Sequence, residues 1–381
     1  MMSPLALLFT LAFVVSIDMR ILIPVLPSIS HSLGSSTGTV GLAMTTYGFA
    51  YGFGQLFYGP LSDRLGRIAV VRAAGIGFSL CTILSALAAT AGQFIILRLL
   101  VGVFAGAVIP LTLVYIGDTV EYGRRQTVLG LYSMITSAAM AFSASLGGTI
   151  SHFISWRVMM LGYGLLAFFP LGLMWRIRTQ TAGATAESAE GFADLLRNRY
   201  ALFIYGAVFL EGFLLWGGMT YLGSFASQRY GLDQFRIGLL ITLLGVGTMA
   251  GGLLMGRISR RFPENGIAAG GGTVLGASFL LLIPSWPLPA FALSAFGLGL
   301  GFVCLHTTLQ LRGTEISAAA RGKAFSLFSF CLFGGIATGS AVFGWLVDAG
   351  LYELMFSLAG VGLIGVGLAS ALAPARFRAS S

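Results

Sequence analysis

Four ionisable side chains interrupt long apolar stretches of this chain: Asp18, Arg20, Arg98 and Glu211. If such a stretch crosses a bilayer, each charge costs at least about 2.5 kcal/mol near the centre, so its presence indicates a function. A carboxylate in a partly dry cavity can take up and release a proton near neutral pH. We therefore expect Asp18 and Glu211 to take part in proton coupling.

The arginines allow a different interpretation of the same acid. Asp18 could form a fixed ion pair with Arg98 or Arg20 and exchange no proton. Arg98, Gly102 and Gly106 recur at four-residue spacing, so they share one helix face. Because glycines let neighbouring membrane helices approach closely, we expect Arg98 to lie beside a tightly packed seam.

Polar and aromatic residues in the same stretches are candidates for the wall of a solute cavity. Pockets for drug-sized ligands are mostly apolar with a few placed polar groups. The candidate substrate-binding residues are Arg20, Tyr47, Tyr51, Gln55, Tyr132, Trp216, His306 and Gln310. Aromatic residues in membrane helices also serve packing alone, and a histidine without acidic neighbours in sequence is typical of a hydrogen-bonded packing residue.

The elements that must position these residues are twelve apolar runs separated by short breaks. The chain is 56% hydrophobic and 9% charged, against about 25% charged in soluble domains. A helix needs about 20 apolar residues to cross a bilayer, whereas a barrel would show alternating segments of about ten. The sequence therefore predicts an all-α membrane protein with twelve transmembrane helices. We place them at residues 5–29, 38–58, 70–90, 93–117, 126–151, 156–177, 200–224, 235–257, 266–285, 288–312, 322–347 and 351–373.

Internal repetition divides these runs into two sets of six. Arg125, Ser133 and Gly148 recur 196 residues later as Arg321, Ser329 and Gly344, and a polar stretch separates the sets. Duplicated six-helix halves related by an axis along the membrane normal hold their solute between them near mid-bilayer. We expect two pseudo-symmetric halves, at residues 1–178 and 198–381, joined by a cytoplasmic linker at 179–197. Asp18 and Glu211 then lie on the first helix of each half.

Charge distribution indicates the orientation and excludes some partners. The net charge is +9, but the basic residues gather in alternate loops, and the opposite loops hold only Arg157, Arg229 and Arg236. This asymmetry predicts an integral protein of a bacterial inner (plasma) membrane with both termini cytoplasmic, and it does not indicate nucleic acid. The three cysteines lack the spacing of a metal site, and no phosphate-binding glycine loop occurs, so we expect no metal and no cofactor.

A charged turn follows the second apolar run and reads Gly59-Pro60-Leu61-Ser62-Asp63-Arg64-Leu65-Gly66-Arg67. It resembles the Gly-x-x-x-Asp-Arg-x-Gly-Arg loop of the major facilitator superfamily, whose members carry small solutes across membranes. In that family the loop is thought to latch the two halves together on the cytoplasmic side. The resemblance assigns this latch to Gly59, Asp63, Arg64, Gly66 and Arg67, with Asp118 or Glu121 as the acid that they reach. An ordinary solvated loop is the alternative.

Two further segments resemble motifs of the drug:proton antiporters in that superfamily. Asp18 to Pro27 is similar to the first-helix motif, and Arg98 to Gly106 to the fourth-helix motif, whose arginine is proposed to assist proton transfer. The fifth helix departs from the pattern, because Ser143-Ala144-Ser145-Leu146-Gly147-Gly148 stands where antiporters carry Gly-Pro-x-x-Gly-Gly. The departure leaves the direction of transport open.

These observations predict a transporter and not an enzyme. We expect a monomer that exports amphipathic organic compounds by alternating access, as a proton-coupled antiporter. The first alternative is proton-coupled uptake of an organic anion or another metabolite, which Arg20 and Arg98 favour. The second is a polytopic membrane enzyme or sensor, but such proteins carry a nucleophile, metal ligands or a sizeable soluble domain, and the sequence offers none.

Overall fold

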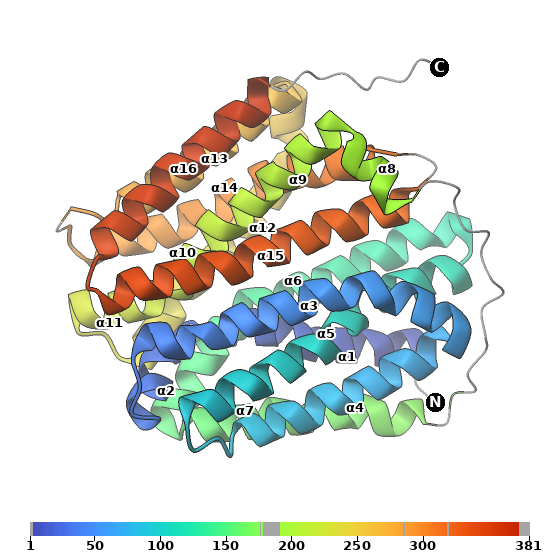
Figure 1. Cartoon of the computed structure of the whole chain (residues 1–381), viewed down its shortest axis with the longest axis horizontal. Helices are drawn as coiled ribbons and strands as arrows, with labels where there is room; N and C mark the ends of the chain where they lie inside the picture. Colours follow the sequence, from blue (N-terminus) through green and yellow to red (C-terminus); the bar gives the residue numbers. More distant parts are fainter. Residues whose placement is uncertain (1–2, 176, 178–190, 285, 318–319, 373–381) are drawn as a thin grey trace.

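The computed structural model describes residues 3–175, 177, 191–284, 286–317 and 320–372, and within these residues every regular element is a helix. The helices run roughly parallel in two groups, with the first half of the chain below and the second above in Figure 1. Nine of the described helices are long and apolar enough to cross a membrane. Three further crossings complete the predicted twelve. The first crossing is broken, the second (Thr37–Leu65) is richer in polar residues, and the ninth (Glu264–Leu280) is shorter.

The first half has an unbroken helix for every crossing except its first. Its elements are α1 (Pro4–Ile21), α2 (Leu26–Ser32), α3 (Thr37–Leu65), α4 (Arg67–Ser85), α5 (Ala91–Thr119), α6 (Tyr122–Phe153) and α7 (Trp156–Met174). Together α1 and α2 form the first crossing, and α3 to α7 form the next five.

The second half begins with a short helix on the predicted linker and then repeats the six crossings. Its elements are α8 (Phe192–Arg197), α9 (Arg199–Glu211), a π-helical turn η1 (Gly212–Trp216), α10 (Gly217–Thr220), α11 (Leu222–Tyr230), α12 (Gln234–Arg261), α13 (Glu264–Leu280), α14 (Leu288–Thr314), α15 (Arg321–Asp348) and α16 (Tyr352–Leu372). Most of the expected linker, residues 178–190, lies outside the described residues.

The first crossing of each half is interrupted, which the sequence analysis did not predict. Between α1 and α2 the backbone turns at residues 22–25, where Pro24 lacks the N–H that a continuous helix would use. The seventh crossing passes through η1 and breaks at Tyr221, so it ends at Tyr230 rather than near residue 224. Transporters place solute and ion sites at such discontinuous helices. The turn at residues 22–25 follows Asp18 closely, and η1 begins directly after Glu211.

The two halves meet along α3 with α15 and α6 with α12. In Figure 1, α15 lies alongside α3 for most of its length. Small residues permit this approach: a side chain at Gly38 would collide with the backbone of Gly344, and one at Gly245 with the backbone of Ala141. The central interface is therefore close-packed backbone to backbone, and any cavity between the halves must form where larger side chains hold them apart.

Candidate functional site

The charged turn is shorter than its sequence suggests. We expected the turn to begin at Gly59, but α3 continues as a helix through Pro60 to Leu65. Only Gly66 leaves the helical region, with φ of +89°, which glycine tolerates and other residues rarely adopt. A side chain at Gly59 would meet open space. The glycine that the geometry requires is therefore Gly66, at the junction of α3 and α4.

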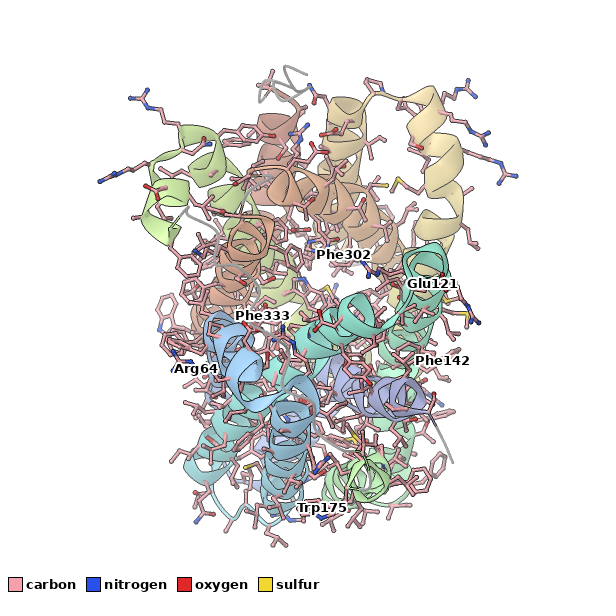
Figure 2. All side chains as sticks on the ribbon, turned by 90° about the vertical axis from the view of Figure 1, so that its right-hand side faces the viewer. Arg64, Glu121, Phe142, Trp175, Phe302 and Phe333 are labelled. Atoms are coloured by element: carbon pink, nitrogen blue, oxygen red, sulfur yellow. The ribbon has the colours of Figure 1, made fainter. Side chains whose placement is uncertain are left out.

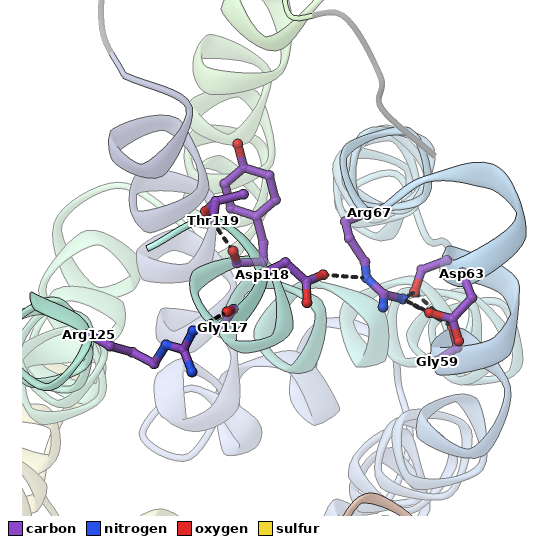
Figure 3. Close-up of polar contacts among 9 residues, drawn as sticks. Gly59, Asp63, Arg67, Gly117, Asp118, Thr119 and Arg125 are labelled. Carbon is purple, nitrogen blue, oxygen red and sulfur yellow. Dashed lines mark hydrogen bonds and ion pairs between the residues drawn. The ribbon is translucent and has the colours of Figure 1, made fainter. Parts of the chain in front are cut away.

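Arg67 collects the polar contacts of this turn, as Figure 3 shows. Its guanidinium forms an ion pair with Asp63, and its Nε lies 3.2 Å from Oδ2 of Asp118 at the end of α5. It also donates a hydrogen bond of 2.5 Å to Ser62 Oγ. The expected pairing of Asp63 with Arg67 is present, and of the two candidate acids Asp118 is the one in contact. Because the side chain of Arg67 is buried, this network fixes the angle between α3, α4 and α5.

The other two latch candidates point away from this network. Arg64 and Glu121 are exposed, and they lie on opposite sides of the end view in Figure 2. Both ion pairs of Arg67 are formed with residues of the first half of the chain. On the opposite half, the side chain of Arg321 at the start of α15 lies outside the described residues. In this conformation the turn is thus anchored to α5 of its own half.

A fully buried ion pair joins α1 to α5. The Arg98 guanidinium donates two hydrogen bonds to Asp18, of 2.8 and 2.9 Å, and both side chains are 0% exposed. Tyr163 on α7 donates a third, of 2.7 Å, to Asp18 Oδ1, and the guanidinium lies 4.7 Å from the ring centre of Tyr47. The structure therefore pairs Asp18 with Arg98 and not with Arg20. In this conformation the Asp18 carboxylate is thus held by three donors, two from Arg98 and one from Tyr163.

The second buried carboxylate has a histidine partner. Oε2 of Glu211 lies 3.0 Å from Nδ1 of His306 on α14, while Oε1 has no hydrogen-bond partner among the described residues. His306 stacks on Phe302 at 4.8 Å between ring centres, and Phe302 in turn meets Trp216 edge to face at 5.7 Å. Sequence alone gave His306 no acidic neighbour, because Glu211 comes from a different crossing.

A cavity with an empty volume of about 780 Å³, which includes its open mouth, lies between the halves. The first half contributes Ile23, α3 and Met140 of α6, and the second contributes η1, α10 and α15. The wall is almost entirely apolar and includes three methionines, at positions 44, 140 and 219. Methionine adapts to irregular shapes and is common on surfaces that accept varied ligands. Such a wall suits an amphipathic organic compound.

Three of the predicted substrate-binding residues belong to this cavity or adjoin it. Tyr47 and Trp216 are part of its wall. The guanidinium of Arg20 lies 5.2 Å from the ring centre of Trp216. Tyr51 lies behind the cavity wall, where its ring centre is 4.2 Å from that of the wall residue Phe333.

The remaining candidates are placed elsewhere. Tyr132 packs against Phe9 at 5.3 Å and donates a hydrogen bond of 3.4 Å to the Ile109 carbonyl. His306 is held by Glu211, and the half-buried Gln55 and Gln310 are not among the residues that the structure places in the wall. Of Tyr47, Tyr51 and Gln55, which recur at four-residue spacing on α3, only Tyr47 belongs to the cavity wall.

One polar contact between the halves was not anticipated. Asp348, the last residue of α15, accepts hydrogen bonds from Ser36 Oγ at 2.5 Å and from the Gly38 N–H at 2.7 Å. These donors belong to the N-terminus of α3, where a helix favours a negative charge. The dipole of a helix disfavours an acid at its own C-terminus. The position of Asp348 in the sequence therefore indicates that another part of the chain compensates its charge. We call this contact the Asp348 clamp.

Comparison with known proteins agrees with the fold. Residues 8–316 match the family model of the Major Facilitator Superfamily. A chloramphenicol resistance protein from Pseudomonas aeruginosa is 26% identical over 340 residues, which cover 85% of this chain and 79% of the relative. A relative from Helicobacter pylori (strain P12), named "Probable sugar efflux transporter", is 25% identical over 357 residues, 93% of this chain and 91% of the relative. The crystal structure of a variant of the nucleoside transporter NupG superposes with a TM-score of 0.82 at 13% identity, covering 97% of this chain and 99% of that one.

Proposed function

Because this chain belongs to the major facilitator superfamily, we propose that it is a proton-coupled secondary transporter that exports amphipathic organic compounds. The observation that carries the proposal is the apolar cavity that both halves line. Its wall residue Trp216 contacts Phe302, and Phe302 stacks on His306, the partner of Glu211. A cavity that both halves line changes its exposure when the halves rock against each other. Transport by alternating access follows from that arrangement, and no catalytic step is needed.

Proton coupling is assigned first to Glu211 and His306. Oε1 of Glu211 is a buried acceptor with no hydrogen-bond partner in the described part of the chain, so a proton bound there would displace no described donor. A histidine beside it offers a second site for the same proton, since histidine changes charge between about pH 5 and 8. Asp18 and Arg98 are assigned a second coupling step, in which Arg98 turns from Asp18 toward another acceptor as the halves move.

The two ends of the bundle provide matching gates. At one end the Asp348 clamp joins α3 to α15, and at the other the turn around Arg67 holds α3 to α5. We assign the latch role to Gly59, Asp63, Arg64, Gly66, Arg67 and Asp118, with Glu121 at its edge, in the state that closes this second end. Closing one gate while opening the other is what alternating access requires.

The remaining proposals follow from the sequence pattern. The halves comprise residues 1–178 and 198–381, and the linker at 179–197 and both termini lie in the cytoplasm of a bacterial inner membrane. We propose a monomer, since one chain forms the whole cavity, and its other partners are protons and lipid. No cofactor and no metal enter the mechanism.

Export rests on the names of the two relatives, which refer to chloramphenicol resistance and sugar efflux. Proton-coupled uptake of an organic anion remains the second candidate. The observation that favours uptake is the Ser143-Ala144 pair, which replaces the Gly-Pro of exporters in α6. Both candidates share the cavity and the proton chemistry, and they differ in the direction of net movement and in the class of solute.

Everted membrane vesicles with an acidic lumen separate the two directions. An exporter accumulates its solute in the lumen of such vesicles, whereas an importer releases it. We expect radiolabelled chloramphenicol or naphthalene-2-sulfonate to accumulate in vesicles that contain the protein, and the accumulation to vanish when the pH gradient is collapsed. Depletion of the lumen would support uptake, and movement independent of the gradient would contradict proton coupling in either direction.

A further inference from the structure

Arg20 is a buried cation without a counter-charge. Arg20 is 3% exposed, and among the described residues its Nε has no hydrogen-bond partner and its guanidinium forms no ion pair. Its guanidinium rests on the ring of Trp216 at 5.2 Å, and Arg20 lies three residues before the wall residue Ile23. A buried charge of this kind is costly unless something outside the chain compensates it.

The two buried acids of the site are already occupied. Asp18 accepts three hydrogen bonds from Arg98 and Tyr163, and Glu211 is in contact with His306. Neither carboxylate lies within ion-pair distance of Arg20 in the described structure. The guanidinium of Arg20 is thus the unbalanced charge beside the cavity, and it is positive.

Two residues of the cavity wall carry polar groups that also have no hydrogen-bond partner within the described structure. These are the hydroxyl of Tyr47 and the indole N–H of Trp216. An indole and a guanidinium can only donate hydrogen bonds, and a phenol can donate as well. Both wall atoms are covered in this conformation, so a ligand reaches them through rotation of neighbouring side chains. A group that satisfies all three residues must be rich in acceptors.

The rest of the wall selects for an apolar body. Met44, Met140, Met219 and Phe333 surround the space and offer it no charge. A compound that fits has a single acceptor-rich head against Arg20, Trp216 and Tyr47, and an aromatic or aliphatic remainder among the methionines. A neutral compound would leave the charge of Arg20 unbalanced.

We propose that the transported solute is an amphipathic organic anion whose head group pairs with Arg20, with Trp216 and Tyr47 as further donors. The inference rests on the proposed transport function and names the chemical class of the solute. It is independent of the direction of transport. It differs from the compounds in the relatives' names, and it makes Arg20 a specificity-determining residue.

Equilibrium binding to the full-length protein in nanodiscs tests this proposal with two probes of the same size. Naphthalene-2-sulfonate carries one negative charge, and naphthalene-2-sulfonamide carries none. We expect the native protein to bind the anion at least about tenfold more tightly, because a hydrogen-bonded charge pair is worth more than a neutral one. Arg20→Gln should bring the two affinities together, while Arg20→Lys should keep part of the preference.

Arg236→Gln is the matched control, because it removes the same charge from a side chain that is 68% exposed and outside the cavity wall. It should leave the preference for the anion unchanged. If Arg20→Gln does not fold, Trp216→Phe keeps an aromatic ring and removes the N–H, and we expect a weaker preference there. Equal affinity for both probes in the native protein, no binding of either, or a full preference in Arg20→Gln would each overturn the proposal.

The outcome also separates this inference from the function on which it rests. Gradient-driven accumulation of chloramphenicol by a protein that ignores the sulfonate would leave the transport function standing and refute the anionic solute. Selective binding of the sulfonate without any gradient-driven movement would refute the transport function and keep the site.

Discussion

At the scale of single residues, the two buried carboxylates face partners of different chemistry. Arg98 keeps its positive charge at every physiological pH, whereas a histidine gains and loses its charge within that range. Two hydrogen bonds hold Asp18 to Arg98, and a third comes from Tyr163, but only one contact holds Glu211. The Glu211–His306 pair is therefore the better suited to exchange a proton during each transport cycle.

Glu211→Gln tests this assignment at the carboxylate. The amide has the same shape but binds no proton at physiological pH, so accumulation driven by a pH gradient should fall at least about tenfold while exchange of solute at equal pH continues. Glu353→Gln, an exposed acid at the start of α16, is the control and should pump normally. Normal pumping by Glu211→Gln would exclude this residue as the proton carrier.

Asp18→Asn tests the ion pair on α1. Removing one partner of a buried pair costs about 3–5 kcal/mol, so we expect a lower thermal midpoint together with loss of gradient-driven transport and retention of exchange. The double variant Asp18→Asn with Arg98→Gln removes both charges and should recover much of the stability without recovering the coupling. A double variant that pumps like the native protein would show that the pair is fixed and carries no proton.

How far sequence could predict the site is seen in three pairings. Asp63 and Arg67 are four residues apart, on either side of the turn at Gly66, so their contact follows from closeness in sequence. Asp18 had two possible partners in sequence, and only the packing of α5 against α1 decides for Arg98. Glu211 and His306 are 95 residues apart, and their contact depends on which faces of two helices turn inward.

At the scale of elements, interruptions and end contacts matter more than helix length. Continuous apolar runs predicted the positions of the crossings but not their breaks. The break after α1 coincides with Pro24, a local feature that hydropathy alone does not register, and the seventh crossing breaks without any proline. The Asp348 clamp likewise joins two helix ends that are about 310 residues apart. Elements could therefore be located from sequence, while their junctions could not.

Asp348→Asn should loosen the clamp. Replacing the carboxylate weakens two hydrogen bonds that its charge strengthens, so amide hydrogen exchange at the start of α3 should accelerate by about tenfold. Asp233→Asn is the control, because Asp233 caps α12 within its own half and should affect only that helix. Unchanged exchange at the start of α3 would mean that the clamp does not hold the halves together.

Gly66→Ala and Gly59→Ala make a matched pair at the charged turn. Gly66 has a positive φ of +89°, which costs a residue with a side chain about 1–3 kcal/mol, so its replacement by alanine should lower the thermal midpoint. Gly59 is helical and faces open space, so alanine there should leave stability unchanged or raise it by up to about 1 kcal/mol. Equal effects in thermal unfolding would contradict the assignment of the turn to Gly66.

At the scale of the whole molecule, the cavity and the gates depend on the relation between the halves. The Asp348 clamp ties them at the end where α3 begins, and the Arg67 network at the other end stays within the first half (Figures 1 and 3). A rocking motion that opens the clamp would bring the second half toward the turn after α3. The fold class was accessible to sequence because length and hydropathy determine it, but the cavity wall was not, since helix rotation decides which residues face inward.

Proton movement that accompanies solute movement is the central claim, and a trapped pH-sensitive dye in proteoliposomes measures it directly. With no imposed gradient, addition of naphthalene-2-sulfonate or chloramphenicol outside should change the lumenal pH, and solute uptake and proton flux should keep a fixed ratio as the amount of protein varies. Solute that enters the lumen in a protein-dependent way without any change in lumenal pH would contradict the account.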